Sequence, residues 1–277
     1  MKKEGLYSIG EISKICNISA SALRYYGEMG IINPVCIDNE TGYRYYDSQT
    51  LMIVPVLRYY QMLGFKLKEI VKLLEREDLS YLKALFEDKI SIQKKDIAFR
   101  IAEMESVDSW LQLINETEEI MAMENCPITC QYFSTIKVFS QKPHIFPDMK
   151  FENLLINNEF CNSATSRSGI TLGALYISFP SVSNRFSGDF KEINLYIRNH
   201  SICDDLSLVT EIGGFSAVVS YHKGSYKTLD ETYKKMKSWA QEHGFQLRGD
   251  SLERYVIDYW SIKNSDWFLT QIFLPII

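Results

Sequence analysis

Glu253 stands in a segment whose side chains alternate as they do in a β-strand. Every second side chain of a strand points to the same face. The residues that share the face of Glu253 are Ser251, Tyr255, Ile257 and Tyr259. An ionised carboxylate in such surroundings is unstable without a partner. That partner is either a protein cation or a positively charged ligand, and the adjacent Arg254 points to the opposite face.

Other aromatic side chains in the second half of the chain are candidate walls of a binding pocket. Rings stack on flat ligands and offer their electron-rich faces to cations. The candidates are Tyr132, Tyr176, Tyr221, Tyr226, Tyr255, Tyr259 and Trp267. Because buried tyrosines commonly belong to the core, we expect about three of them to line a pocket.

Two arginines near the N-terminus are flanked by tyrosines and suit contacts with phosphate. Arg24 precedes Tyr25 and Tyr26, and Arg44 stands between Tyr43 and Tyr45. Guanidinium groups bind phosphate with paired, charge-assisted hydrogen bonds. We expect about half of these tyrosines to be core residues, since a small domain needs aromatic filling.

Local signals place these side chains on a helix-turn-helix. Ser8 and Glu11 form a capping box, which predicts a helix from Ser8. Ser19 caps a second helix that runs through Tyr26. In this motif the second helix enters the major groove, so its early polar residues face DNA. These residues are Ser19, Ser21 and Arg24.

A hairpin and two helices complete the N-terminal unit. The turn-forming residues 38–42 precede Tyr43–Tyr46, which predicts a wing. Asp47 or Ser48 caps a third helix that extends to about Met62, and Gly64 separates it from a fourth helix at about 67–75. The sequence therefore predicts a winged helix-turn-helix.

Length and charge agree with a DNA reader joined to another domain. A chain of 277 residues favours two domains, and its net charge of −5 excludes a protein that merely coats nucleic acid. Residues 1–74 carry nine basic and seven acidic side chains, which leaves the remainder at −7. No apolar stretch is long enough to span a bilayer, and six scattered cysteines suit a reducing compartment, so we expect a cytoplasmic protein.

Five blocks in the first 75 residues resemble the MerR family of regulators. The blocks are 7–12, 23–26, 30–34, 42–46 and 63–70. The resemblance implies that the DNA-binding set also includes Arg58 and Lys66, that the protein is a homodimer, and that it acts on promoter DNA with RNA polymerase. Ala22, Gly27 and Gln61 depart from the family pattern, and Gln61 weakens one phosphate contact.

A long helix follows the winged unit. Residues 81–115 contain neither Pro nor Gly, and apolar residues recur every seven positions. The main seam is Ile90, Ile97, Met104 and Leu111, with Phe86, Val107 and Ile114 beside it. This pattern predicts a coiled coil, although Gln93 and Arg100 interrupt it, and an amphipathic helix on its own domain is the alternative. The resemblance implies an antiparallel dimer.

After Pro127 the pattern changes to strands. We expect strands at 129–139, 171–179, 193–197, 208–221, 252–259 and 267–274, a helix at 229–243 and a looser segment at 151–163. This order repeats β-α-β-β twice, which indicates a duplication around a concave surface. The predicted fold is a multidomain α+β protein: 1–75 the winged unit, 76–122 the dimer helix, and 123–277 the duplicated sensor domain.

The last domain resembles the GyrI-like ligand-binding domain of multidrug-sensing MerR-type activators. The resemblance is carried by 222–226, Trp239, 244–245, 252–255 and 273–276. It implies an aromatic or cationic ligand held by Glu253, which we favour over a structural ion pair. Gln271 stands where some relatives have a second acid, and its neutrality favours less cationic ligands.

Two alternatives remain open. The first is a metal- or thiol-responsive MerR-type regulator: Cys126 and Cys130 lie where metal-sensing relatives bind metal, but two thiols are too few for a convincing metal site. The second is a hydrolase, because some GyrI-like proteins look to hydrolyse small electrophiles with a pocket glutamate. Glu253 would then be the general base, but the sequence shows no nucleophile to accompany it. We expect a non-enzymatic regulator without cofactor or metal, whose partners are double-stranded promoter DNA, RNA polymerase, a small effector and a second copy, and not a membrane.

Overall fold

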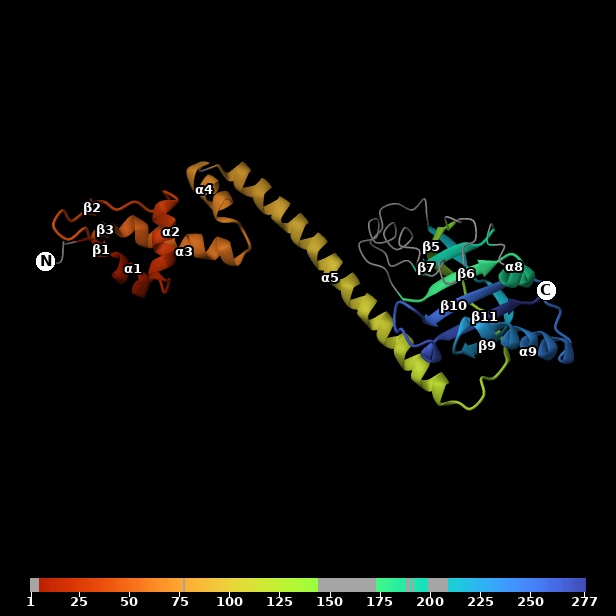
Figure 1. The fold of residues 1–277 in the computed structure, drawn as a ribbon. Coiled ribbons are helices and arrows are strands. Elements are labelled where there is room, and N and C mark those ends of the chain that lie inside the picture. Colours follow the sequence, from red (N-terminus) through yellow and green to blue (C-terminus); the bar gives the residue numbers. More distant parts are fainter. Residues whose placement is uncertain (1–4, 77, 144–172, 188–189, 191, 199–208) are drawn as a thin grey trace. The chain divides into compact units, whose positions relative to one another are not determined.

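The structure, a computed structural model, describes residues 5–76, 78–143, 173–187, 190, 192–198 and 209–277 (Figure 1). The chain divides into two compact units, Met1–Lys94 and Lys95–Ile277. None of the helices in the described part of the chain has both the length and the apolar character needed to cross a membrane.

The first unit begins with the predicted helix-turn-helix. Helix α1 (Ile9–Ile15) is capped by Ser8, whose hydroxyl accepts the Glu11 N–H at 3.3 Å while its own N–H donates to the Glu11 carboxylate at 2.8 Å. Helix α2 (Ala20–Glu28) is capped by Ser19. The turn between them passes through Asn17, which has a φ of 48°. Both predicted helix starts are confirmed.

A small sheet and two further helices support that motif. Strand β3 (Arg44–Tyr46) pairs with β2 (Cys36–Ile37) to form the predicted wing, and with β1 (Tyr7–Ser8), a strand that the sequence did not predict. Helices α3 (Ser48–Met62) and α4 (Leu67–Arg76) follow, and Asp47 caps α3. The core of this unit is built from Ile12, Leu23, Tyr26, Ile32, Tyr46, Val54, Leu57, Phe65 and Ile70. The predicted winged unit is confirmed.

Helix α5 (Leu79–Ala122) is a single helix of 44 residues. Its C-terminal part buries Ala102, Leu113 and Ile120 in the second unit. The predicted heptad residues are largely exposed in the single chain, with Ile97 at 60% and Met104 at 65%. Phe86 differs from the expectation, because it packs on Phe65 in the first unit, with ring centroids 5.1 Å apart, instead of belonging to the seam.

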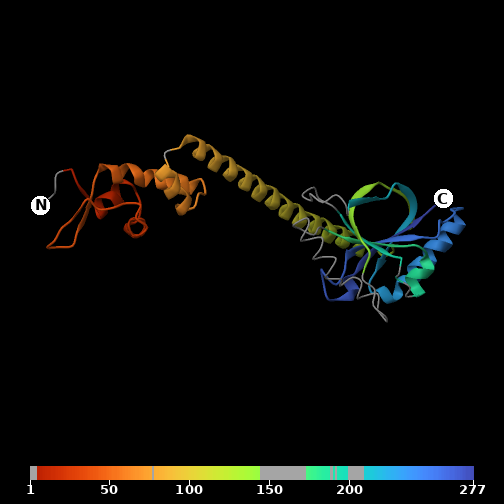
Figure 2. The same ribbon diagram turned by 90° about the horizontal axis from the view of Figure 1, so that it is seen from above.

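An eight-stranded antiparallel sheet forms the second unit. Its strands are β4 (Thr129–Phe133), β5 (Ile136–Gln141), β6 (Leu175–Phe179), β7 (Asn194–Arg198), β8 (Val209–Ile212), β9 (Phe215–Lys223), β10 (Ser251–Ile257) and β11 (Leu269–Pro275). Their order in space is β4-β9-β11-β10-β6-β7-β5-β8. The order β9-β11-β10 is mirrored by β6-β7-β5, as the predicted duplication requires of the strands. Figure 2 shows how the sheet curls.

Three predicted segments differ from the structure. The expected strands 129–139 and 208–221 are each two strands, because the chain turns at Ser134–Thr135 and at Gly213–Gly214. The last strand begins at Leu269, after a short 3-10 helix, η3 (Ser265–Trp267). A short helix between β6 and β7, α8 (Val182–Ser187), was not expected. The looser segment 151–163 lies outside the described residues.

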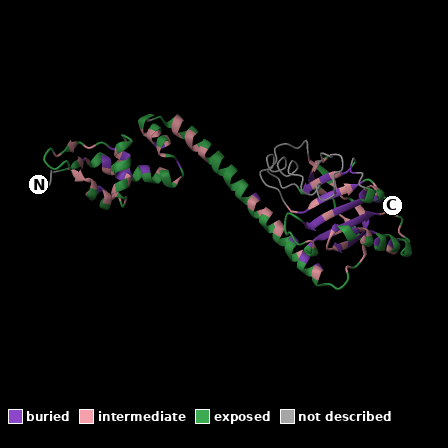
Figure 3. Ribbon diagram, in the orientation of Figure 1, coloured by how far each residue is buried: buried purple, intermediate pink, exposed green. Residues whose placement is uncertain are grey.

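The sheet separates two packed layers. Helix α9 (Leu229–Glu242) lies on one face, where Tyr233 and Met236 pack on β9 and β11. Helix α5 contributes Leu113 and Ile120 to a cluster that also holds Val256. Figure 3 shows that burial is concentrated in the strands, whereas most of α5 is exposed. Because neighbouring side chains of β10 alternate between faces, Glu253 and Arg254 lie in different layers.

Candidate DNA-reading surface and ligand site

The start of α2 presents a polar surface. Ser19, Ser21, Arg24 and Tyr25 are all exposed, and the hydroxyls of Ser19 and Ser21 lie 2.9 Å apart. Arg24 forms no ion pair with any side chain that the structure describes, so its guanidinium is free to contact a phosphate. The arrangement suits a helix that enters a groove of DNA with its first turn.

The wing presents a second polar surface. Tyr43 is 62% exposed and Arg44 is also exposed, whereas Tyr45 is half-buried. Gly42, at the turn, has a φ of 70°, a conformation that favours glycine. The hairpin thus holds a cation and a ring at its end.

Two of the residues expected to contact DNA form hydrogen bonds within the fold. Tyr26 is buried, and its hydroxyl donates to the Gln61 side chain at 2.8 Å. Arg58 donates to the carbonyl of Asn17 at 2.7 Å, which holds the turn of the helix-turn-helix. The side chain of Lys66 is exposed, and its backbone N–H donates to the Glu69 carboxylate at the start of α4.

Glu253 is completely buried at the middle of β10. Its carboxylate accepts hydrogen bonds from Tyr233 on α9, at 2.7 Å, and from Tyr255 on its own strand. The Arg185 guanidinium of α8 forms an ion pair with it at 2.7 Å. Burial and the nearby carboxylate raise the pKa values of both tyrosines well above the ordinary value, so they remain donors.

Arg185 is the cation that the sequence analysis missed. Burial lowers its pKa, but the Glu253 charge, the nearby Tyr255 and Tyr233 and the hydrogen bond to Glu253 together raise it by more, so the guanidinium remains charged. The guanidinium lies over the rings of Phe179 and Phe186, 5.3 and 5.5 Å from their centroids. A serine at 181, whose hydroxyl caps α8 at Asn184, is the sequence signal that could have revealed this helix.

Further aromatic rings lie beside this ion pair. Tyr226 packs on Tyr255, with ring centroids 5.7 Å apart, and stacks on Phe268 at 5.2 Å. Tyr259 lies beyond the end of β10, and its ring meets Phe268 at 4.7 Å. His222, on the same face of the sheet, is neutral because burial lowers its pKa. We call Glu253, Arg185, Phe179, Phe186, Tyr233 and Tyr255 the guanidinium cage.

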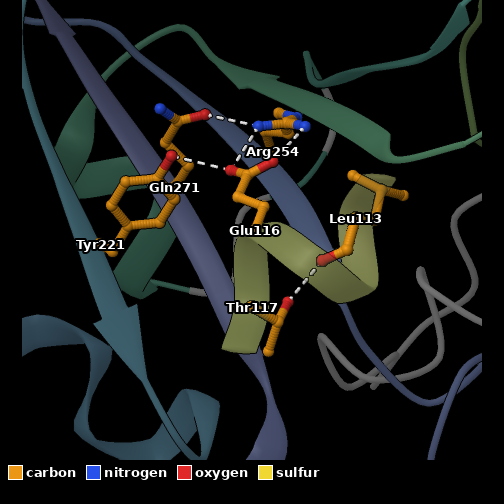
Figure 4. Close-up of polar contacts among 6 residues, drawn as sticks. All are labelled: Leu113, Glu116, Thr117, Tyr221, Arg254 and Gln271. Atoms are coloured by element: carbon orange, nitrogen blue, oxygen red, sulfur yellow. Dashed lines mark hydrogen bonds and ion pairs between the residues drawn. The ribbon is translucent and has the colours of Figure 1, made fainter. Parts of the chain in front are cut away.

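Three of the expected ligand residues, Tyr176, Tyr221 and Gln271, lie on the opposite face of the sheet. Together with Arg254 they form a row across β6, β10, β11 and β9. Arg254 forms a two-pronged ion pair with Glu116 of α5, at 2.8 and 2.9 Å, and also donates to Gln271 at 2.9 Å (Figure 4). The Tyr221 hydroxyl donates to the same carboxylate at 2.7 Å.

This second cluster fixes α5 to the sheet. Burial and the hydrogen bond to Glu116 raise the pKa of Tyr221, so its hydroxyl remains a donor. Gln271 is bound to Arg254 rather than aligned with Glu253. The nine expected ligand residues therefore do not form one pocket. Tyr132 on β4 and Trp267 on η3 are both exposed, at 65% and 49%.

The cysteines do not form a metal centre in the part of the chain that the structure describes. No group of three or more His, Cys, Asp or Glu side chains there is placed to hold a metal ion. Cys130 is exposed, and burial raises the pKa of the half-buried Cys126 thiol.

Two family models match the chain. Residues 7–77 match the MerR HTH family regulatory protein, and residues 194–277 match the GyrI-like small molecule binding domain. The first match covers the winged unit, and the second covers α9 and the strands from β7 to β11.

Three relatives show how far the similarity extends. The multidrug-efflux transporter 1 regulator of Bacillus subtilis (strain 168) is 36% identical over 110 residues, which cover 34% of this chain and 39% of that protein. The multidrug-efflux transporter 2 regulator of the same organism is 23% identical over 98% of this chain and 96% of its own length. The mercuric resistance operon regulatory protein of Bacillus cereus is 32% identical over 44% of this chain and 93% of that protein.

The winged helix-turn-helix, the matching family models and this last relative, which is covered almost completely, lead to the same conclusion. The chain belongs to the MerR family of helix-turn-helix transcription regulators and carries a GyrI-like domain in its C-terminal half.

Proposed function

We propose that this regulator binds a planar aromatic cation at the guanidinium cage. One observation carries the proposal: the cage already holds a planar, delocalised cation, the Arg185 guanidinium, between a buried carboxylate and two rings. A ligand of the same charge and shape finds the same partners there. It competes with Arg185 for Glu253.

Binding rather than catalysis fits the surroundings of Glu253. A general base needs a free oxygen directed at a nucleophile. Both Glu253 oxygens already accept hydrogen bonds from neighbouring side chains. We therefore propose a non-enzymatic sensor.

At the other end of the chain, we propose that α2 and the wing bind promoter DNA in the cytoplasm. Ser19, Ser21, Arg24, Tyr25, Tyr43 and Arg44 provide the exposed polar and aromatic surface for it. Two copies, paired through α5, hold two such units. Ligand binding favours the dimer conformation that bends and untwists the promoter, so that RNA polymerase engages it; a ligand with equal affinity for both conformations would have no effect.

Competition with Arg185 gives a direct test of the ligand site. Calorimetry is carried out with 10-methylacridinium, a planar cation, and with neutral acridine as its matched control. Arg185→Met removes the competing cation and should tighten 10-methylacridinium binding, whereas Glu253→Gln should weaken it by about 1–3 kcal/mol. Acridine should respond to neither substitution. If both variants bind the cation as the wild type does, the cage is not the ligand site.

Transcription in vitro tests the regulatory step. DNA fragments selected by the purified protein serve as templates for RNA polymerase, with and without 10-methylacridinium. We expect the cation to change transcript levels with the wild type and not with Glu253→Gln. An unchanged transcript level and an unchanged footprint with the wild type at saturation would rule out the activator mechanism.

A further inference from the structure

An apolar hollow lies between α5 and the segment that follows β10. Its volume is about 470 Å³, within the range of small-molecule pockets. The walls include Trp110, Ile114, Thr117 and Glu118 of α5, and across from them Trp260 and Trp267. Three of the four tryptophans in the chain therefore border one hollow. The guanidinium cage is separate, because neither Glu253 nor Arg185 borders the hollow.

Local interactions hold the walls in place. The Asp258 carboxylate, itself buried, accepts the backbone N–H of Trp260 at 2.9 Å. Asn264 caps η3 and so positions Trp267, by accepting the N–H of Asp266 at 3.0 Å. Trp110 packs beside Leu113 and Ile120 in the cluster that joins α5 to the sheet. The hollow is thus built on ordered elements.

The polar groups of the hollow define its chemistry. The Thr117 hydroxyl donates to the Leu113 carbonyl at 2.8 Å, so its donor does not need a hydrogen-bond acceptor on a ligand. Glu118 is exposed at the rim and forms no ion pair with any residue that the structure describes. Trp260 and Trp267 remain about half exposed, at 50% and 49%, so part of each ring is open to a ligand.

We propose that this hollow is a second ligand site, which takes planar aromatic cations. Indole rings are the strongest aromatic partners of cations, and a flat ligand can stack on them. The Glu118 carboxylate attracts positive charge to the rim. Each chain then binds two molecules of the same chemical class, one at the cage and one at the hollow.

Calorimetry on the full-length protein tests this proposal in the Glu253→Gln background, where the affinity of the cage is reduced. In Glu253→Gln, 10-methylacridinium should still bind at one site per chain. Adding Trp267→Ala should weaken that binding by about tenfold, since a stacking surface is lost. Adding Glu118→Gln should weaken it by up to about fivefold for the cation and leave acridine unaffected, as expected for an exposed charge.

Trp239 provides a matched control. It lies outside the hollow, where it stacks on His243 and Phe245, with ring centroids 4.0 and 5.7 Å away. Trp239→Phe in the Glu253→Gln background should bind the cation with unchanged affinity. Because Trp267 and Glu118 are exposed, circular dichroism should show all variants folded.

Three results would overturn the proposal. The first is a Glu253→Gln protein that binds no 10-methylacridinium, which would leave the cage as the ligand site. The second is binding that neither Trp267→Ala nor Glu118→Gln weakens. The third is binding that appears only when the protein is diluted below its dimerisation range, which would show that a second copy covers the hollow. If the cage proves not to be a ligand site, the cation should still bind at the hollow, so the two proposals are tested separately.

Discussion

The Glu253 carboxylate and the Arg185 guanidinium form a buried ion pair, 2.7 Å apart, in which each charge compensates the other. Strand alternation correctly placed Tyr255 on the face of Glu253 and Arg254 on the other face. It was wrong for Ile257, which a register shift pairs with Leu269 on the α5 side, and for Tyr259, which lies beyond the end of β10. It could not reveal Arg185, because that residue is 68 positions away and lies in a helix too short to leave a periodic pattern. The partner of a buried charge is decided by tertiary packing.

Removing the charge of Glu253 should destabilise the protein without ligand. Glu253→Gln leaves the Arg185 guanidinium buried without its counter-charge, which is expected to lower the free energy of unfolding by about 3 kcal/mol. The double variant Arg185→Met, Glu253→Gln should recover part of that loss. Urea denaturation measures both. A Glu253→Gln protein more stable than the wild type would contradict the importance of the ion pair.

Arg44 and Arg58 should separate DNA binding from stability. Arg44→Ala should weaken affinity for a selected promoter fragment by about 1–3 kcal/mol and leave the melting temperature unchanged, because its side chain is exposed. Arg58→Ala should lower stability by about 1 kcal/mol, because its hydrogen bond to Asn17 is lost. Fluorescence anisotropy and thermal melts distinguish the two. Equal DNA affinity of Arg44→Ala and the wild type would remove the wing from the DNA-binding surface.

At the scale of elements, the sequence predicted strands least accurately where a turn interrupts a run of apolar residues. The sequence predicted 208–221 as one strand, because apolar residues continue through it. The chain breaks at Gly213, where φ is 104° and the backbone passes the Ser134 carbonyl so closely that a Cβ would lie 2.4 Å from its oxygen. Helix starts were predicted more accurately, because their capping residues are local.

Gly213→Ala should therefore be strongly destabilising. Both the positive φ and the clash with the Ser134 carbonyl oppose a side chain, and we expect a loss of about 3 kcal/mol. Gly249 is the matched control: its φ is 106°, but a Cβ there meets nothing within 4 Å. Gly249→Ala should cost about 1 kcal/mol, from backbone strain alone. Equal losses in denaturation experiments would show that the close approach to Ser134 has no effect.

The turn after β10 should make stability depend on pH. Burial raises the pKa of Asp258 from 3.8 to about 6. Because the folded state holds this proton more tightly than the unfolded chain, the free energy of unfolding should fall as pH rises from about 4 to about 6, by at most about 3 kcal/mol. Asp258→Asn should remove that part of the dependence. Denaturation curves across this range that have the same slope in both proteins would contradict the assignment.

At the scale of the molecule, the sequence predicted the modules and their order. The seven-residue repeat predicted the long helix α5, and the repeated strand pattern predicted the sheet. Both predictions succeeded because apolar residues recur with the period of the element that buries them. The sequence could not show which α5 residues pack on the sheet. Glu116 lies among charged residues typical of an exposed helix surface, yet it binds Arg254. Such a contact depends on how two elements meet.

The exposed seam of α5 should hold the dimer together. Met104→Lys places a charge at a seam position that is 65% exposed in the single chain, and should convert the dimer to monomers because burying an unpaired charge is unfavourable. Ser91→Lys, exposed on the opposite side of α5, is the control. Light scattering after size exclusion measures the mass. A Met104→Lys dimer that persists on dilution would show that another surface joins the copies.

The bridge between Glu116 and Arg254 also has a consequence for sequence divergence. The two positions are 138 residues apart, and each is satisfied by the other. A substitution that removes one charge leaves its partner partly buried and uncompensated, so it is tolerated mainly when the partner changes too. Among related chains, positions 116 and 254 should therefore vary together. Their joint state would then indicate, without any structure, which relatives fix the end of this helix to the sheet and which leave it free.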